Sequence, residues 1–151
     1  IVRIALASDD LIGSELVDTL TGTALADRIV GNGGNDTLYG NGGDDRLNGG
    51  RGNDAMWGGA GKDVFVFDTL ARGEKDAIRD FGTSDRVYTT TKISDSNNDG
   101  IVTFGSDKRL DVGGGEVAIY SEAGKTVTAL HFLGEVVEDG ATFYAYGLLG
   151  Q

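Results

Sequence analysis

The architecture of this chain follows from four consecutive nine-residue segments: GNGGNDTLY at 31–39, GNGGDDRLN at 40–48, GGRGNDAMW at 49–57 and GGAGKDVFV at 58–66. Each segment begins with glycine, has aspartate at its sixth position and carries an apolar side chain at its eighth. The same spacing of nine continues toward the N-terminus, and the complete series is Asp9, Asp18, Asp27, Asp36, Asp45, Asp54 and Asp63. Because a linker has no reason to keep an apolar residue two positions after every aspartate, the pattern indicates a structural repeat.

Each repeat divides into a glycine-rich turn and an extended triplet such as Thr37-Leu38-Tyr39. Alternate side chains of an extended triplet point to opposite faces, so that the eighth residue points inward and its neighbours point outward. Two repeats then form one coil with strands on opposite walls, and coils stack about 4.8 Å apart as parallel ladders. We therefore predict an all-β fold in which residues 4–66 form a parallel β-roll around a narrow apolar core.

Composition narrows the possible partners. The chain has 151 residues, 13 basic and 24 acidic side chains, a formal net charge of −11 and no cysteine. So acidic a surface repels phosphate groups, which argues against nucleic acid as a partner and favours cations. No apolar run approaches the roughly 20 residues of a membrane span, and without cysteine there are no disulfides or thiolate metal sites. Because the chain begins with Ile1, we expect a fragment of a larger protein.

The turns pose an electrostatic problem, because stacking brings aspartates 18 residues apart in the sequence close together. Two carboxylates about 5 Å apart repel each other by roughly 3 kcal/mol at an effective dielectric of 20. A hard divalent cation between the turns would replace this repulsion with coordination and would also engage turn carbonyls. Carboxylate and carbonyl oxygens are the ligands typical of Ca²⁺, whereas magnesium and zinc fit such carbonyl-rich turns less well.

The segments resemble the RTX nonapeptide repeat, GGxGxDxUx, a calcium-binding repeat. The resemblance is good over residues 13–66 and marginal over 4–12, and it implies a right-handed parallel β-roll with about three to five Ca²⁺ ions between turns. In this family the first and third positions supply carbonyls to one ion, the second and fourth supply them to its neighbour, and the aspartate contacts both. The repeats that begin at Gly13 and Gly22 read SELV and TALA in place of GxGx, which leaves ions there open.

Carried onto this sequence, the resemblance implies a first set of carbonyls from Gly31, Gly33, Gly40, Gly42, Gly49, Arg51, Gly58 and Ala60. It implies a second set from Asn32, Gly34, Asn41, Gly43, Gly50, Gly52, Gly59 and Gly61. The implied carboxylates are Asp36, Asp45, Asp54 and Asp63, with Asp18 and Asp27 in addition. Pairing each repeat with the next but one joins Asp36 to Asp54 and Asp45 to Asp63, followed by Asp27 to Asp45 and Asp18 to Asp36.

From about Asp68 the period disappears, and residues 67–151 are predicted to form a β-rich cap that continues the roll. The expected strands are 86–92, 101–104, 116–121, 126–133 and 141–149. They are separated by short turns, Asp99-Gly100, Ala123-Gly124 and Asp139-Gly140, which favour antiparallel hairpins.

Further carboxylates in this half are candidate ligands. The opening of this half (GKDVFVFD, DAIRDF and SDRV) is similar to the segment that follows the repeats in secreted RTX enzymes. Asp76 and Asp80 are therefore candidates for the last calcium site, with a surface role as the alternative. The stretch Asp95, Asn97 and Asp99 is similar to a D-x-N-x-D-G calcium loop, but Ser106 stands where a bidentate glutamate is expected, and a plain turn is the alternative.

We predict no catalytic activity for this chain, because no triad or zinc site can be assembled around its single histidine, His131. The resemblance implies a calcium-binding module of a larger bacterial protein, exported to the extracellular space by type I secretion machinery and folding where calcium is abundant. The alternative is a calcium-dependent module that binds an acidic or neutral polysaccharide, as in alginate epimerases. Arg28 and Arg46 on one wall, and the outward Tyr39 and Trp57, are the residues that such a module could use.

Overall fold

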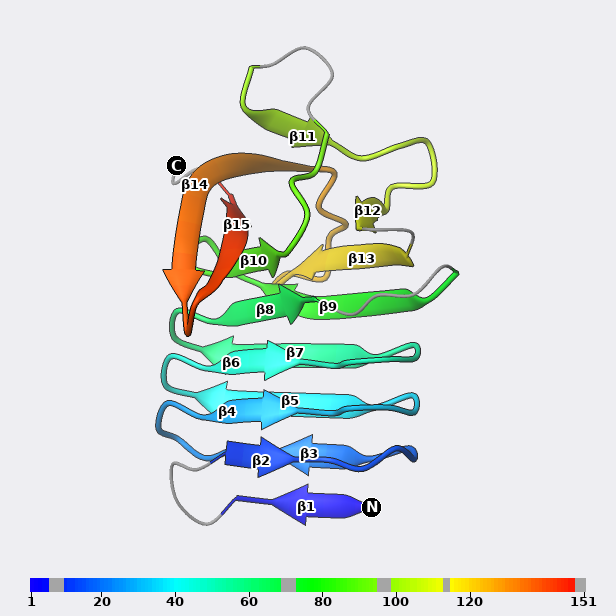
Figure 1. Ribbon diagram of the computed structural model, residues 1–151, viewed down its shortest axis with the longest axis vertical. Helices are drawn as coiled ribbons and strands as arrows, with labels where there is room; N and C mark the ends of the chain where they lie inside the picture. The colour runs from blue at the N-terminus through cyan, green and yellow to red at the C-terminus, as the bar shows by residue number, and fades with distance from the viewer. Residues whose placement is uncertain (6–9, 69–72, 95–98, 113–114, 149–151) are drawn as a thin grey trace.

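The computed structural model describes residues 1–5, 10–68, 73–94, 99–112 and 115–148, and within them all regular structure is β (Figure 1). The strands are β1 (Val2–Ile4), β2 (Asp10–Ile12), β3 (Thr19–Thr21), β4 (Arg28–Val30), β5 (Thr37–Gly42), β6 (Arg46–Asn48), β7 (Ala55–Ala60), β8 (Val64–Phe67), β9 (Lys75–Phe81), β10 (Arg86–Thr89), β11 (Ile101–Thr103), β12 (Leu110–Val112), β13 (Gly115–Ser121), β14 (Ala129–Glu138) and β15 (Ala141–Gly147). Among these residues no helix could span a membrane. The predicted all-β class is confirmed.

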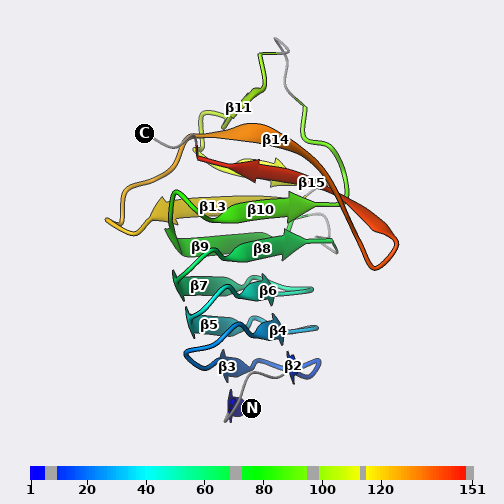
Figure 2. The ribbon, with the colours of Figure 1, turned by 90° about the vertical axis from the view of Figure 1, so that its left-hand side faces the viewer.

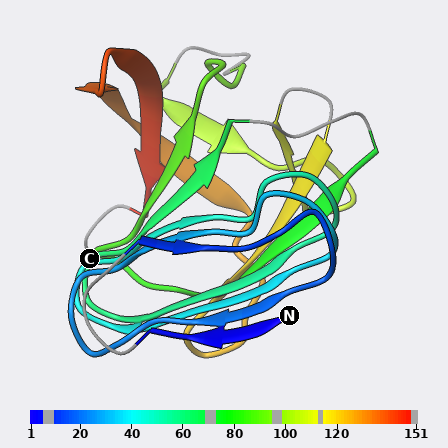
Figure 3. The same cartoon turned by 60° about the horizontal axis from the view of Figure 1, so that its bottom comes forward.

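The repeats form two parallel walls. The order β1-β3-β5-β7-β9 makes one wall and β2-β4-β6-β8-β10 makes the other. Each strand pairs with the strand 18 residues further on, as Leu20 pairs with Leu38 and Ile29 with Leu47. Figures 2 and 3 show the coils stacked one upon the next from the N-terminal end, with the two walls facing each other. The predicted parallel β-roll is therefore confirmed.

The apolar residues at the eighth repeat positions build the core between the walls. From Leu20 to Phe65 all six of them are fully buried, at 0% exposure, and Leu11 at the N-terminal end retains 9%. This burial alternates with half-exposed neighbours, as the period of two in an extended triplet requires.

The parallel stacking continues past the last glycine-rich repeat. β9 pairs with β7 and β10 with β8, both with an offset of 22 residues, as in the pairs Met56–Ile78 and Phe65–Val87. The offset exceeds 18 by four because the aspartates Asp63 and Asp76 are 13 residues apart rather than nine. Residues 75–89 thus add one further coil to the roll.

The cap covers the C-terminal end of both walls. β13 pairs in parallel with β9, and β12 pairs antiparallel with β13. On the other wall β15 pairs antiparallel with β10 and joins β14 through a turn at Asp139-Gly140. Both residues of that turn have positive φ, 49° and 79°, as a two-residue hairpin turn requires. The predicted strands at 86–92, 101–104, 116–121 and 141–149 correspond to β10, β11, β13 and β15, whereas β9 and β12 were not predicted.

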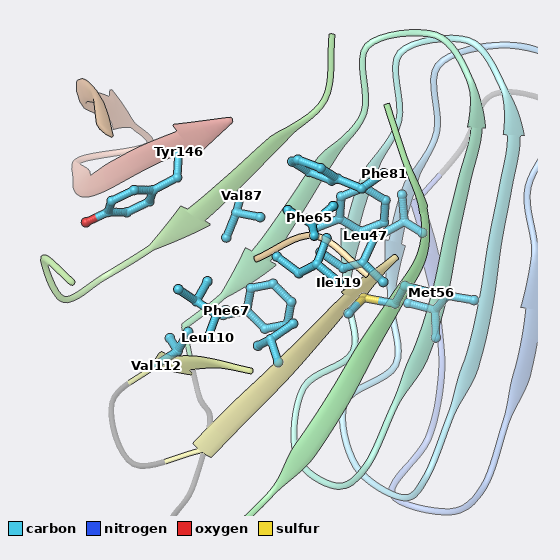
Figure 4. Close-up of a cluster of buried hydrophobic side chains, with 14 of the residues drawn as sticks. Leu47, Met56, Phe65, Phe67, Phe81, Val87, Leu110, Val112, Ile119 and Tyr146 are labelled. Atoms are coloured by element: carbon cyan, nitrogen blue, oxygen red, sulfur yellow. The ribbon is translucent and has the colours of Figure 1, made fainter. Parts of the chain in front are cut away.

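The cores of roll and cap merge where the last coil meets β13. Figure 4 shows Met56, Phe65 and Phe81 of the roll beside Ile119 of the cap, with Val87 leading on to Tyr146. The rings of Phe65 and Phe81 lie 6.0 Å apart between centroids. A single apolar cluster therefore joins the two parts.

Candidate calcium sites between the coils

The turns of the full repeats have a backbone shape that few side chains tolerate. The second and fourth positions are left-handed, with φ of 76° at Asn32, 106° at Gly34 and 123° at Gly52. A Cβ at Gly52 would collide with the carbonyl oxygen of Gly34 in the preceding coil. Because L residues avoid this region and this contact leaves no room for a side chain, glycine is required there. The glycines of the repeat therefore serve close coil-to-coil approach.

The aspartates form a continuous ladder up each wall. The backbone N–H of each donates to the Oδ1 atom of the aspartate one coil further on: Asp18 to Asp36 (2.8 Å), Asp27 to Asp45 (2.8 Å), Asp36 to Asp54 (2.7 Å) and Asp45 to Asp63 (2.9 Å). All six aspartates from Asp18 to Asp63 are buried. The structure thus brings together each pair that next-but-one pairing predicted, while the role of these residues as ligands stays a prediction.

The second carboxylate oxygen of four aspartates has no hydrogen-bond partner. These buried Oδ2 atoms belong to Asp36, Asp45, Asp54 and Asp63. A buried acceptor without a donor costs roughly 1–3 kcal/mol, and more when it carries charge. Such an oxygen therefore calls for a partner that the polypeptide does not supply.

Carbonyl oxygens of the next coil face the same spaces. A Cβ placed on Gly31 would touch both Oδ2 of Asp36 and the carbonyl oxygen of Gly49, and one on Gly40 would touch both Oδ2 of Asp45 and the carbonyl oxygen of Gly58. Two oxygen acceptors without an intervening donor fit a hard cation. The carbonyls of Asn32, Gly34, Asn41 and Gly43 likewise lie against the following coil. No position of the carbonyls of Gly33, Gly42, Arg51 and Ala60 is established, so their role stays a prediction.

Burial makes the ion-free carboxylates reluctant to ionise. It raises the pKa of Asp45 to about 7, that of Asp54 to about 7 and that of Asp63 to about 6, although a backbone N–H bond lowers each pKa in part. Neighbouring aspartates of adjacent coils add repulsion in the same direction. A bound cation would remove both costs, because it neutralises the charge where it is buried.

Asp18 and Asp27, in the two degenerate repeats, have different surroundings. Oδ2 of Asp18 accepts hydrogen bonds from the backbone N–H and the hydroxyl (2.9 Å) of Ser14. Oδ2 of Asp27 accepts the same two bonds from Thr23, with the hydroxyl at 2.9 Å. In addition, the N-terminal ammonium of Ile1 lies 2.8 Å from Oδ1 of Asp18. This ammonium and the Ser14 amide lower the pKa of Asp18 to about 2.

The last coil supplies three further carboxylates. Asp76 and Asp85 extend the two ladders by accepting the backbone N–H groups of Asp54 (2.8 Å) and Asp63 (3.0 Å). Asp80 accepts the amides of Gly58 and Gly59, both at 2.9 Å. Burial raises the pKa of Asp76 to about 8. Asp85 was missed in the sequence, although it lies nine residues after Asp76 and is followed two residues later by an apolar side chain, Val87.

The other sequence-based candidates are not drawn into this arrangement. Asp95 and Asn97 lie outside the described residues, and Oδ1 of Asp99 accepts the N–H of Ile101 at 2.8 Å, as in a local turn. His131 is half-buried on β14, where its backbone pairs with Ile101. Within the described residues no three His, Cys, Asp or Glu side chains form a metal site by themselves. Ions between the coils would therefore take many ligands from the backbone.

The outward residues proposed for polysaccharide contact are largely engaged within the chain. Tyr39 and Trp57 stack on each other with ring centroids 4.9 Å apart, which occupies one face of each ring. Arg46 forms an ion pair with Glu138 (2.8 Å), and its guanidinium lies over the ring of Phe143 at 5.2 Å. Of the two arginines, Arg28 is the more available, since its ion pair with Asp10 (3.2 Å) is exposed.

Comparison with known proteins agrees with this geometry. The family model of the RTX calcium-binding nonapeptide repeat matches residues 12–47, 21–56 and 39–69. Among solved structures, the AlgE6R3 subunit of the mannuronan C5-epimerase from Azotobacter vinelandii is similar, with a TM-score of 0.53 and 29% sequence identity over 78% of this chain and 70% of that one. No curated protein sequence matches the chain. The repeat section of this chain, residues 12–69, therefore belongs to the RTX calcium-binding nonapeptide repeats.

Proposed function

We propose that the chain is a calcium-dependent folding module in which four Ca²⁺ ions lie between successive coils. The observation that carries this proposal is the set of four buried Oδ2 atoms without a hydrogen-bond donor, at Asp36, Asp45, Asp54 and Asp63. At two of them the position of a facing carbonyl from the next coil supports coordination by both coils. Four ions lie within the range of three to five that the RTX resemblance implies.

Calcium would act by mass action on folding. An ion that binds only the folded roll stabilises it by RT ln(1 + [Ca²⁺]/Kd), so that folding follows the calcium concentration. Little calcium inside a cell would leave the acidic chain extended, and abundant calcium outside would fold it. This supports a role in the secretion and stability of a larger bacterial protein that reaches the extracellular space by a type I system. The chain itself contributes the ion-binding roll and is not the catalytic part.

A calcium titration tests this function. We expect far-ultraviolet circular dichroism of the full chain in chelator to lack most of the β signal, and this signal to return on addition of Ca²⁺ but not of equal Mg²⁺. Equilibrium dialysis should count about four ions per chain. A chain that is fully folded in chelator, or that retains no calcium, would contradict the proposal.

A second candidate function is calcium-dependent binding of an anionic polysaccharide, which the similarity to a subunit of a mannuronan epimerase favours. An open depression of about 450 Å³ on the outer face of the β2-β4-β6-β8-β10 wall is lined by Arg28, Arg51, Asn32 and Asn48, with Glu15 and Asp68 at the same place. Calorimetric titration with oligouronates in calcium should show binding that Arg28→Ala/Arg51→Ala reduces at least about tenfold. Unchanged binding in that variant would remove this depression from consideration.

A further inference from the structure

We infer that Ser14 and Thr23 close the two N-terminal turns of the roll to calcium by taking the place of the ion. The inference rests on the proposed function, because it concerns which of the stacked turns bind the metal. Six pairs of aspartates face each other across successive coils, beginning with Asp18–Asp36 and Asp27–Asp45. Only the first two of these six gaps contain a Ser or Thr at the second repeat position.

The hydrogen bonds in these two gaps occupy the oxygen that would bind the ion. In the full repeats, Oδ2 of the aspartate is buried and has no donor, as at Asp36 and Asp45. In the degenerate repeats, Oδ2 of Asp18 receives the amide and hydroxyl of Ser14, and Oδ2 of Asp27 receives those of Thr23. Two donors on one carboxylate oxygen compensate its charge in the way that a cation would, but without any metal.

The backbone of these two turns differs in the same sense. Among the described residues, positive φ at a non-glycine residue occurs only at Asn32, Asn41, Lys108 and Asp139. Thr23 and Leu25 therefore lack the left-handed shape that the equivalent Asn41 and Gly43 adopt one coil later. With this shape missing, the carbonyls of the TALA turn are not oriented as in GNGG, and an ion would find fewer ligands. Side chain and backbone thus exclude calcium together.

The consequence is a roll with two kinds of coil. Residues 10–27 form a coil that is held by hydroxyl and amide bonds, and calcium is confined to the gaps that begin at Asp36 and end at the last coil. Ser14 and Thr23 act as specificity-determining residues, because they set where along the ladder metal binding begins.

A matched pair of variants on one wall tests this inference. Asp27→Asn and Asp45→Asn change the same repeat position in adjacent coils. We expect Asp27→Asn to bind as many calcium ions as the unaltered chain, and Asp45→Asn to bind one ion fewer, as counted by equilibrium dialysis and native mass spectrometry. Loss of an ion in Asp27→Asn would overturn the inference. Retention of every ion in Asp45→Asn would instead contradict the proposed function.

A gain of binding provides the second measurement. Thr23→Gly/Leu25→Gly converts the TALA turn to GAGA, removing the hydroxyl and restoring glycine at both left-handed positions. We expect one additional calcium ion relative to the unaltered chain, whereas Thr23→Ser, which keeps the hydroxyl, should add none. An unchanged ion count in the double variant, with normal circular dichroism in calcium, would also overturn the inference. If the double variant does not fold, the Asp27→Asn and Asp45→Asn counts still decide.

Discussion

The roll and the cap are stabilised by different means. Every buried carboxylate among the described residues lies in the roll, from Asp18 to Asp85, and none lies in the described part of the cap. The cap instead buries apolar side chains such as Val102, Leu110, Leu130 and Tyr146. Per nonapeptide the repeats bury one large apolar residue and one charge, and hydrophobic burial of a single side chain yields only about 1.5–3 kcal/mol. Stability in the roll must therefore come largely from ions, and stability in the cap from packing.

Removal of calcium should separate the two parts most strongly. In excess chelator we expect backbone amides of residues 28–64 to lose hydrogen-exchange protection almost completely, because their carboxylates repel one another without ions. Amides of β14 and β15 should keep measurable protection, since their hairpin and apolar contacts contain no buried charge. Equal loss in both regions, measured by exchange mass spectrometry, would show that the cap depends on the roll.

A core truncation in the cap should have the next largest effect. Leu130 on β14 is fully buried, and Leu130→Ala should lower the free energy of unfolding by about 2–5 kcal/mol. The number of bound calcium ions should stay as in the unaltered chain. Urea unfolding in saturating calcium gives the stability, and dialysis gives the ion count. A reduced ion count would mean that cap packing reaches the metal sites.

Neighbouring aspartates in one repeat allow a sharper test of the ladder. Asp45 is buried with an Oδ2 atom that lacks a donor, whereas Asp44 is exposed and accepts only the amide of Lys62, at 2.9 Å. Asp45→Ala should raise the calcium midpoint of folding several-fold more than Asp44→Ala does. Equal shifts in a circular dichroism titration would show that the repeat is out of register with this assignment.

Acid should weaken the roll's response to calcium. Burial raises the pKa of Asp45 and Asp54 to about 7 in the ion-free fold, above the ordinary value of 3.8. Between these values the ion-free roll binds more protons than the unfolded chain, so its stability falls as pH rises. Calcium needs ionised carboxylates, so its affinity rises over the same range. We expect the calcium midpoint to be higher at pH 5 than at pH 8, and a pH-independent midpoint would argue against buried carboxylate ligands.

The contact between hairpin and roll should matter least. Arg46 on β6 meets Glu138 and Phe143 of the hairpin, and it is partly exposed. Arg46→Ala should therefore cost about 1 kcal/mol or less. Thermal unfolding in low and high salt would measure this small term. A much larger loss would show that the hairpin is essential for the outer wall.

Much of this structure could be predicted from local spacing. The aspartate ladder and the buried eighth residue follow from a period of nine, because each repeat meets only its neighbours. The further coil at 75–89 was missed because a four-residue insertion before Asp76 shifts the phase, although Asp76 and Asp85 resume the spacing of nine. The ion pair of Arg46 with Glu138 could not be predicted, because it depends on where the cap hairpin folds back.

The alternation of repeats between two walls makes the parity of their number matter. β13 docks on β9 and β15 docks on β10, so that each cap sheet extends one particular wall. Deleting residues 40–57, two repeats, shortens the stack by one storey and returns every later strand to its own side. Deleting 40–48 alone would interchange the sides for everything that precedes the cut, and each cap sheet would then continue the opposite series of coils. The molecule can therefore change length in steps of two repeats, whereas a single step alters which face each cap sheet prolongs.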